Sequence, residues 1–377
     1  MADNKDKKVL NVPALRFPEF TGEWERHKLS EVCSFYSGGT PSSSKKEYYN
    51  GNIPFIRSGE LHKDYTELFI TEAGLSNSAA KLVETGDLLL ALYGATSGDI
   101  AISKIKGAIN QAILCIRTKQ DKKFIESVWN KHVERLLQTY LQGGQGNLSS
   151  DIVKNIPFYF ANSEEQDKLA KFISLLDERI ATQNKIIDKL ETLIKGIRHK
   201  VFRQLRKDFG FNSTIGDILS FEQPQRYIVS SAEYSNDDTF IPVLTANKAF
   251  ILGYTTETDG IYDKGDCIII DDFTLDCKYI SFPFKVKSSA IKILTASNKF
   301  ILRYTYEYLK SLELSTEEHK RHYITEIQPY SCVLPDENTL KTIALVFENL
   351  AYKLANEQSL ALILNKQRQY LLSKMFI

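Results

Sequence analysis

The sequence predicts an α+β protein in which two similar mixed α/β domains are separated by two long antiparallel coiled-coil helices and related by a pseudo-twofold internal repeat. Three observations predict it: two long heptad patterns, a constant offset between them, and short matching stretches ahead of each. The predicted parts are an N-terminal arm (1–19), domain 1 (20–160), a first long helix (161–206), domain 2 (207–332) and a second long helix (333–377).

Apolar side chains recur at alternating steps of four and three residues in both predicted long helices, which is the spacing of a coiled-coil seam. Each seam position of the second helix lies 174 residues after its counterpart in the first, so the segments are copies of one pattern. The first seam comprises Leu169, Ile173, Leu176, Ile180, Gln183, Ile187, Leu190, Ile194, Ile197 and Val201. The second comprises Ile343, Phe347, Leu350, Leu354, Glu357, Ala361, Leu364, Arg368, Leu371 and Met375.

Each seam has a polar interruption near its middle, Gln183 in the first and Glu357 in the second. Midway positions meet only if the helices pair in full register. An antiparallel pairing fits a duplicated chain better, because a pseudo-twofold axis then relates the halves. A buried polar layer costs stability but fixes the register of the helices. The alternative is that both side chains extend to solvent.

Matching stretches precede the helices in both halves, at offsets that drift as expected for loops of unequal length. The pairs are 29–35 with 215–221, 53–56 with 241–244, and 86–90 with 265–269. Apolar, partly β-branched runs predict strands in both domains, and longer amphipathic stretches predict helices. The strands are expected at 88–93, 109–116, 267–270 and 290–294, and the helices at 124–141 and 300–312.

Composition and the ends of the chain restrict the class of protein. Hydrophobic residues make up 43% and charged residues 25%, as in ordinary globular proteins, and the 48 Lys and Arg nearly balance the 47 Asp and Glu. A uniformly basic coat is therefore excluded. There is no secretory segment and no apolar run that could span a bilayer, so we expect a cytoplasmic protein. The five scattered cysteines predict reduced thiols rather than disulfides or a zinc site.

Catalytic motifs are missing from the sequence. It has no Gly-x4-Gly-Lys-Ser/Thr phosphate loop, no Gly-x-Ser-x-Gly elbow and no His-Glu-x-x-His zinc helix. Asn155–Phe158 superficially resembles the tetrad of amino-methyltransferases, but Ile occupies its second position. His319 and His322 allow metal ligation, although a solvated or phosphate-facing run of charges suits them better. We expect no catalytic residue, no resident metal and no cofactor in this chain.

Basic residues are grouped within each predicted domain. The stretch 278–303 holds six Lys or Arg and no acid, and 100–119 holds four and no acid. A basic stretch alone usually marks a solvated face, but cations at matching places of two repeats, beside Gly-rich loops, favour nucleic-acid binding. A helix of about 33 residues spans roughly 50 Å, while major-groove faces recur about every 34–36 Å. We therefore expect a bipartite, non-palindromic DNA target with an unread spacer.

Residues for base reading are expected among Arg, Lys, Asn and Gln of the polar loops, with Ser or Thr in support. The alternative for each is a polar residue that stabilises its own loop. The candidates in domain 1 are Ser43, Lys45, Arg57, Thr96, Ser97, Gln145 and Asn147. Those in domain 2 are Arg226, Asn247, Lys248, Thr274, Lys285, Lys287, Lys320 and Arg321.

Over essentially its whole length the chain resembles the specificity (S) subunit of type I restriction-modification systems. No single motif is decisive, but their order within the duplicated layout is specific. The residues that carry the resemblance are Asn11–Phe20 with Trp24, Ser37–Pro41, Gly86–Leu90, Gln145–Ser149, Ile156-Pro157 with Glu164–Gln166, Ile241–Asn247 and Asp271–Thr274.

The resemblance implies two target-recognition domains and two spacer helices in a subunit that binds double-stranded DNA and two methyltransferase (M) subunits. It further implies that restriction (R) subunits join later, and that the partners use S-adenosylmethionine, ATP and Mg²⁺. The second copy departs from the pattern, because it lacks the Glu-Glu-Gln start and carries Arg368 where the first has Ile194. A weaker second helix or partner contact is therefore expected. The rival interpretations are a coiled-coil adaptor that does not bind DNA and a self-contained DNA-modifying enzyme with degenerate motifs.

Overall fold

The computed structural model describes residues 10–141, 147–245, 250–316 and 320–377. The chain divides into two compact units, and each contains one α/β domain and a stretch of both long helices. Unit 1 is Met1–Gln183 with Leu360–Ile377, and unit 2 is Asn184–Ser359. Within the described residues, no helix is both long enough and apolar enough to cross a membrane.

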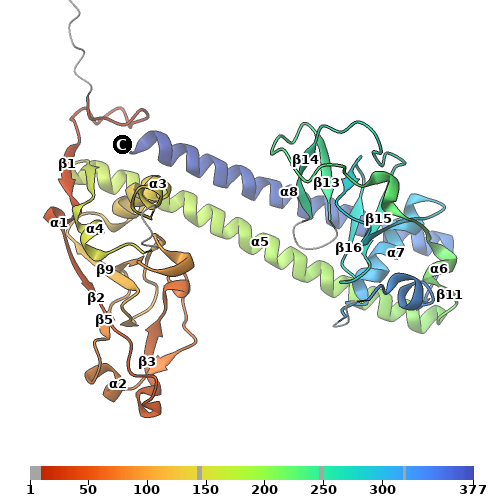
Figure 1. Cartoon of the computed structure of the whole chain (residues 1–377), viewed down its shortest axis with the longest axis horizontal. Helices are drawn as coiled ribbons and strands as arrows, with labels where there is room; N and C mark the ends of the chain where they lie inside the picture. The colour runs from red at the N-terminus through yellow and green to blue at the C-terminus, as the bar shows by residue number, and fades with distance from the viewer. Residues whose placement is uncertain (1–9, 142–146, 246–249, 317–319) are drawn as a thin grey trace, which may run out of the picture. The chain divides into compact units, whose positions relative to one another are not determined.

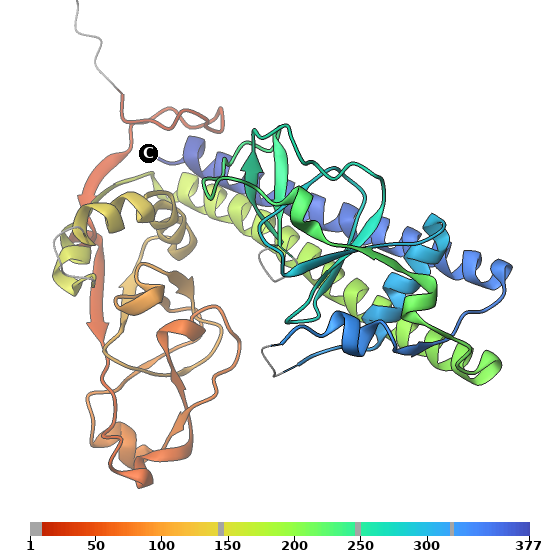
Figure 2. The same ribbon diagram turned by 45° about the vertical axis from the view of Figure 1, so that its right-hand side comes forward.

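The two long helices are α5 (Ser163–Phe209) and α8 (Glu337–Met375), and they lie side by side (Figure 1, Figure 2). In unit 1, Leu169 and Ile173 near the start of α5 share a hydrophobic core with Met375 at the end of α8. In unit 2 the reverse holds, because the later part of α5 packs against the early part of α8. The helices therefore run antiparallel, and every predicted seam position is buried or half-buried, which confirms the predicted coiled-coil pairing.

Polar side chains cap the starts of both long helices. The Oδ1 atom of Asn162 accepts a hydrogen bond from the backbone N of Glu165 at 2.9 Å, and Oδ1 of Asp336 accepts one from N of Thr339 at 3.0 Å. Each cap satisfies an amide that has no partner within the first turn of a helix. Both helices thus begin shortly after an apolar-Pro strand or loop, where the backbone leaves its domain.

Domain 1 contains two four-stranded sheets and a two-stranded ribbon. The first sheet has the order β2 (Cys33–Ser37), β9 (Ile113–Thr118), β6 (Leu88–Ala91) and β7 (Ile100–Ile102). The second has the order β4 (Phe69–Ile70), β3 (Tyr49–Ile56), β8 (Gly107–Ile109) and β5 (Lys81–Val83). The ribbon pairs β1 (Glu25–Lys28) with β10 (Pro157–Phe160). The helices are α1 (Leu29–Val32), α2 (Glu72–Ser76), α3 (Lys122–Leu141) and α4 (Ser150–Asn155).

Domain 2 repeats this plan, but its second sheet has three strands where that of domain 1 has four. Its first sheet has the order β12 (Ser220–Glu222), β18 (Ile291–Thr295), β15 (Cys267–Asp271) and β16 (Cys277–Ile280). Its second has the order β14 (Ile251–Thr255), β13 (Ile241–Leu244) and β17 (Lys285–Val286). The ribbon pairs β11 (Ser213–Thr214) with β19 (Ser331–Cys332). The helices are α6 (Ile215–Ile218) and α7 (Lys299–Ser311).

The strand order and register of the two domains correspond. β3 pairs in parallel with β8 in domain 1, and β13 pairs in parallel with β17 in domain 2. In the first sheets, β6 and β15 each lie between two antiparallel neighbours. The matching sequence stretches fall on these elements, namely α1 with α6 and the strand after each, β3 with β13, and β6 with β15. The predicted internal repeat is therefore confirmed at the level of topology.

The N-terminal arm is attached to unit 1 through a buried carboxylate at the start of α5. Glu165 is 1% exposed and accepts hydrogen bonds from Nε and Nη2 of Arg16 at 2.7 and 2.6 Å, and from Nε1 of Trp24 at 3.1 Å. The ring of Trp24 in turn contacts Phe124 and Phe376. These contacts explain why Arg16, Trp24 and Glu165 occur together among the residues that carry the resemblance.

Candidate DNA interface

Loops from four parts of domain 1 meet at one edge of its first sheet, where β2 and β6 end and β7 and β9 begin. The backbone N of Leu92 donates to the carbonyl O of Ala112 at 2.8 Å, and N of Leu148 donates to O of Leu92 at 2.9 Å. The N of Gly38 donates to O of Asn110 at 3.2 Å. We call this surface the loop edge of domain 1. Its segments are Ser37–Thr40, Leu92–Gly98, Asn110–Ala112 and Asn147.

Domain 2 has the same arrangement at the equivalent edge. The backbone N of Asp272 donates to O of Ala290 at 2.7 Å, and N of His322 donates to O of Asp272 at 2.9 Å. Asp272 thus corresponds to Leu92, and the residue ahead of His322, which is Arg321, corresponds to Asn147. The loop edge of domain 2 consists of Gln223–Tyr227, Asp272–Asp276, Lys287–Ala290 and Lys320–His322.

Three of the predicted readers in domain 1 lie together on its loop edge. Thr96 and Ser97 belong to the segment after β6, and Asn147 lies beside them because Leu148 is bonded to Leu92. The side chain of Asn147 is exposed, and Thr96 is half-buried. The hydroxyl of Ser97 donates to O of Leu92 at 3.0 Å, so in this structure it stabilises its own loop.

The remaining described candidates of domain 1 lie apart from this group. Ser43 and Lys45 precede β3, and the Nζ of Lys45 donates to the hydroxyl of Tyr48 at 3.0 Å. Arg57 follows β3, at the opposite end of that strand. Its guanidinium forms ion pairs of 2.7 Å with both Glu60 and Glu67.

The ion pair with Arg57 also lowers the pKa of Glu60. Burial acts to raise the pKa of Glu60, but hydrogen bonds from the side chain and backbone of Arg57 and from Thr66 outweigh it and lower the pKa to about 2. Glu60 is therefore ionised throughout the neutral range. Arg57 is thus held in a structural ion pair in this structure, although its backbone borders the loop edge through the pairing of Ile56 with Ile109.

Five of the predicted readers in domain 2 lie on its loop edge, and all five side chains are exposed. They are Arg226, Thr274, Lys287, Lys320 and Arg321. Nη1 of Arg321 lies 3.6 Å from Oδ2 of Asp272, and the guanidinium lies 5.8 Å from the centroid of the Phe273 ring. Lys320 forms an ion pair of 3.1 Å with Glu326.

Lys285, another predicted reader, lies inside domain 2. It is 3% exposed, its Nζ forms an ion pair of 2.7 Å with Glu257, and it donates to the carbonyl of Asp259 at 2.6 Å. The strand β17 turns this side chain into the domain, where its charge is already compensated. We therefore leave Lys285 out of the proposed DNA contacts.

The basic stretches of the sequence do not form continuous positive faces. Within 278–303, Lys285 and Lys292 are buried and paired with acids, and Arg303 pairs with Glu307 at 2.7 Å. Within 100–119, Lys106 pairs with Glu84 and Arg117 with Asp87, each at 3.0 Å. Both stretches present cations, with Lys104 and Lys287 exposed, but the positive charge is not one-sided because acidic side chains pair with several of the other cations.

Three of the predicted DNA-binding residues and one of the two histidines considered for metal ligation are not described by the structure. Gln145, Asn247 and Lys248 lie outside the described residues, as does His319. His322 is 1% exposed, so it is not a solvated residue. Among the described residues, no group of three or more His, Cys, Asp or Glu is placed to hold a metal ion.

The polar residues of the two seams are not fully exposed. Gln183 is 6% exposed, so it does not extend to solvent, and Glu357 is half-buried.

Asp272 of the domain 2 loop edge, which contacts Arg321, and the buried Lys292 of β18, which pairs with Asp272, were not among the predicted candidates. Lys292 is a charged residue within the otherwise apolar run Ile291–Leu294, and it stands where the register of domain 1 places Leu114. An alignment of the two halves of the sequence would have shown a lysine in domain 2 where domain 1 has a leucine. That difference could have identified the ion pair of Lys292 with Asp272.

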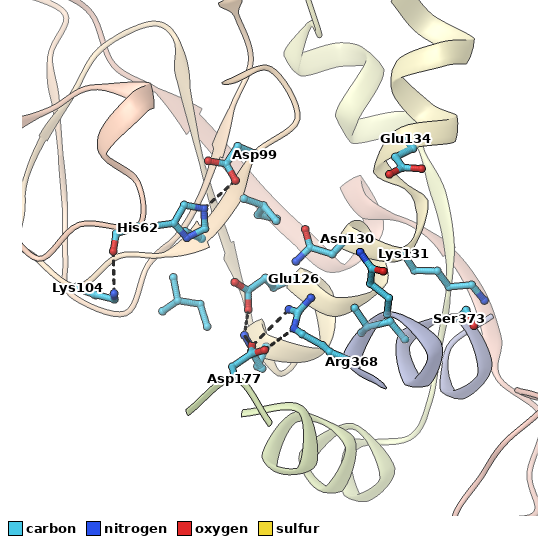
Figure 3. Close-up of a pocket in the computed structure, with 16 residues that line it drawn as sticks. His62, Asp99, Lys104, Glu126, Asn130, Lys131, Glu134, Asp177, Arg368 and Ser373 are labelled. Carbon is cyan, nitrogen blue, oxygen red and sulfur yellow. Dashed lines mark hydrogen bonds and ion pairs between the residues drawn. The ribbon is translucent and has the colours of Figure 1, made fainter. Parts of the chain in front are cut away.

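A separate polar pocket of about 850 Å³ lies within unit 1, between domain 1 and the helix pair (Figure 3). Several of its charged groups pair with one another. Nζ of Lys123 lies 2.6 Å from Oδ2 of Asp177, which also pairs with Arg368, and His62 bonds Asp99 at 2.8 Å. The ion pairs of Asp177 connect α3, α5 and α8 at this pocket.

Comparisons with known proteins agree with this arrangement. Residues 21–192 match the family described as type I restriction modification DNA specificity domain. The type I restriction enzyme EcoR124I/EcoR124II specificity subunit of Escherichia coli is 43% identical over 141 residues, which cover 36% of this chain and 35% of that subunit. The MjaIX specificity subunit of Methanocaldococcus jannaschii is 23% identical over 94% of this chain and 92% of its own length.

Solved structures extend the likeness to the whole fold. The crystal structure of a type I restriction-modification S subunit from M. genitalium covers 97% of this chain and 99% of its own, with a TM-score of 0.66 and 17% identity. The stretches aligned with the E. coli subunit and with the MjaVIII subunit of M. jannaschii span 35% and 45% of those relatives. Residues 21–192 thus match a type I restriction modification DNA specificity domain, and over nearly its whole length the chain is similar to specificity subunits of type I restriction-modification systems.

Proposed function

We propose that this chain selects DNA sequences for a type I restriction-modification complex, and that each loop edge reads one half of a bipartite, asymmetric site. The observation that carries the proposal is one backbone framework with different side chains in the two domains. Leu92 and Asn147 in domain 1 correspond to Asp272 and Arg321 in domain 2. Two unlike reading surfaces on one scaffold suit two unlike half-sites.

The side chains at the edges are of the types that read base edges. Asn can form a bidentate pair with adenine, and Arg can form one with guanine, so Asn147 and Arg321 are the proposed readers of their domains. Arg226, Lys287 and Lys320 are the proposed phosphate contacts of domain 2, because single cations suit phosphate oxygens. The edge of domain 2 carries more cations than that of domain 1, which supports a steeper salt dependence for its half-site.

The long helices are proposed to set the spacer between the half-sites and to bind two M subunits. Exposed apolar side chains on the outer faces of the helices support the docking role, because such side chains on a helix indicate a partner surface. On α8, Ile363 and Tyr370 are 60% and 59% exposed and lie two turns apart on one face. Leu175 of α5 is 57% exposed.

We assign the chemistry to the partner subunits. Methylation with S-adenosylmethionine belongs to the M subunits in this proposal, and ATP- and Mg²⁺-dependent cleavage to the R subunits. In the unit 1 pocket, Lys123 and Arg368 pair with Asp177 and His62 pairs with Asp99, which supports a structural role for these charged groups.

The test is an exchange of residues 20–155 of domain 1 with the same region of a relative of different specificity, followed by methylome sequencing of cells that carry the chain and its partners. One half-site is expected to change and the other to persist. A change in both half-sites would contradict independent reading. A complex without any sequence preference would favour the adaptor, and methylation by the purified chain alone would favour the self-contained enzyme.

A further inference from the structure

A buried ion pair connects the segments of the domain 2 loop edge. Asp272 and Lys292 are each 1% exposed, and Nζ of Lys292 lies 3.1 Å from Oδ2 of Asp272. Lys292 also donates to Oε1 of Gln223 at 2.9 Å. The other oxygen of Asp272 accepts from the backbone N of His322 and Tyr323 at 3.1 and 2.8 Å. One carboxylate and one ammonium therefore connect the segments that follow β12 and β15 and the segment at 320–323.

The side chain of Arg321 lies beside the carboxylate of this ion pair. Its Nη1 is 3.6 Å from Oδ2 of Asp272, its guanidinium lies over the ring of Phe273, and half of its side chain is exposed. The carboxylate and the ring restrict the guanidinium on one side, while the rest of it faces solvent. A planar fork restricted in this way loses little freedom when it binds two acceptors, such as O6 and N7 of guanine.

In domain 1, uncharged residues occupy the positions that correspond to Asp272 and Lys292. The register of β6 with β9 and of β15 with β18 places Leu114 where domain 2 has Lys292. The backbone hydrogen bonds place Leu92 where domain 2 has Asp272. Both leucines are buried, at 1% and 2% exposure. Since apolar residues close this edge in domain 1, and since replacing a buried ion pair by apolar residues is often neutral, stability does not explain the pair.

We propose that Asp272 and Lys292 are positioning residues that aim Arg321 at one base pair of the domain 2 half-site. Asp272 orients the guanidinium and the backbone that carries it. Lys292 neutralises the carboxylate and holds Oε1 of Gln223, which leaves the amide nitrogen of Gln223 as a donor for DNA. This inference rests on the proposed function, because it assumes that the loop edge reads DNA.

The test replaces the ion pair of domain 2 by the leucines that domain 1 has at the corresponding positions. The full chain with Asp272→Leu and Lys292→Leu, co-expressed with its modification subunits, is incubated with a library of random-sequence duplex DNA, and the bound DNA is sequenced. We expect the base preference at one position of the domain 2 half-site to fall about 10-fold or more, with the domain 1 half-site unchanged. Arg321→Ala is expected to erase the preference at that same position.

Two further variants separate positioning from loss of stability. Leu309→Ala removes a buried side chain of α7 and is expected to lower the thermal midpoint while all base preferences persist. Asp272→Asn with Lys292→Met retains an acceptor for the backbone amides but removes the attraction for Arg321. This variant is expected to weaken the same base preference. It tests the positioning role if the double leucine variant does not fold.

The outcomes distinguish this inference from the proposed function. If Arg321→Ala changes a base preference but neither double variant does, the positioning role is overturned and the reading surface stands. If Arg321→Ala and Asn147→Ala both leave every preference intact, the loop edges do not read DNA and both proposals fail.

Discussion

Arg368 of α8 forms an ion pair with Asp177 of α5 within unit 1, at a seam position whose counterpart in the first repeat is Ile194. Nζ of Lys123 in α3 lies 2.6 Å from the same carboxylate. The departure from the heptad pattern at Arg368 is thus matched by an acidic partner on the facing helix. The ion pair connects α3, α5 and α8, so it couples the helix pair to domain 1.

Replacing Arg368 by Ala is expected to lower the free energy of unfolding by about 1 kcal/mol. The loss is modest because both side chains are partly exposed and because Asp177 keeps Lys123 as a partner. Urea denaturation of the full chain measures the change. Lys195→Ala, which breaks an exposed ion pair with Glu313, is the matched control and is expected to cost less than about 0.5 kcal/mol. Equal losses in the two variants would contradict a coupling role for Arg368.

The stability contributed by Asp177 is expected to depend on pH. Burial acts to raise its pKa, but hydrogen bonds from Arg368 and Lys123 outweigh it, so the pKa of Asp177 lies below its ordinary value. A carboxylate with a lowered pKa stabilises the fold fully above the unfolded pKa, near 4, and loses this effect as the pH falls through the folded pKa. The difference in unfolding free energy between the protein and Asp177→Asn should therefore be constant from pH 5 to 8 and shrink below pH 4. A difference that grows on acidification would refute this account.

Glu165 is expected to be among the most sensitive positions of unit 1. Glu165→Gln leaves Arg16 without its bidentate partner in a buried site, so we expect a loss of about 2–4 kcal/mol. Thermal denaturation measures it, and the fluorescence of Trp24, which donates to the same carboxylate, reports the local change. The control is Lys168→Ala, which removes an exposed ion pair with Glu19 and should change stability by less than about 0.5 kcal/mol. A Glu165→Gln protein as stable as the control would show that the arm is not anchored here.

Two glycines of the domain 1 loop edge are expected to differ in their tolerance of alanine. Gly94 and Gly98 have φ of +75° and +87°, which costs an L residue about 1 kcal/mol. A Cβ on Gly94 meets open space, whereas one on Gly98 would lie 2.9 Å from Cγ2 of Val133 in α3. Gly98→Ala should therefore cost about 1–3 kcal/mol more than Gly94→Ala in chemical denaturation. Similar losses would mean that α3 yields to the added methyl group.

The heptad positions and the repeated stretches were sufficient to predict the main features of the fold. A seam depends on local spacing, so Leu169, Ile173 and their copies in α8 could be identified without tertiary information. The direction of charged side chains could not. Lys285 and Lys287 are two residues apart and would share a face in a continuous strand, but β17 ends at Val286, so the first is buried and the second is exposed.

The candidate site was predictable in its residue types but not in its pairing. Asn147 and Arg321 belong to the types that read bases, and polar loops surround both. Their equivalence rests on backbone hydrogen bonds from Leu148 to Leu92 and from His322 to Asp272, which join segments distant in the sequence. Loops of different length hide this correspondence, because the offset between the two halves changes along the chain.

Gln183 provides the last prediction, which concerns the spacer. Its side chain is 6% exposed at the middle of the first seam, where a buried amide fixes the register of paired helices at some cost in stability. Gln183→Leu is expected to leave the stability unchanged or higher and to change the preferred spacer length more than the affinity for either half-site. Methylome sequencing of cells with the variant and its partners measures the spacer, and Ile187→Leu, an apolar exchange in the same seam, is the control. If the variant methylates sites with the same spacer as the control, Gln183 does not set the register.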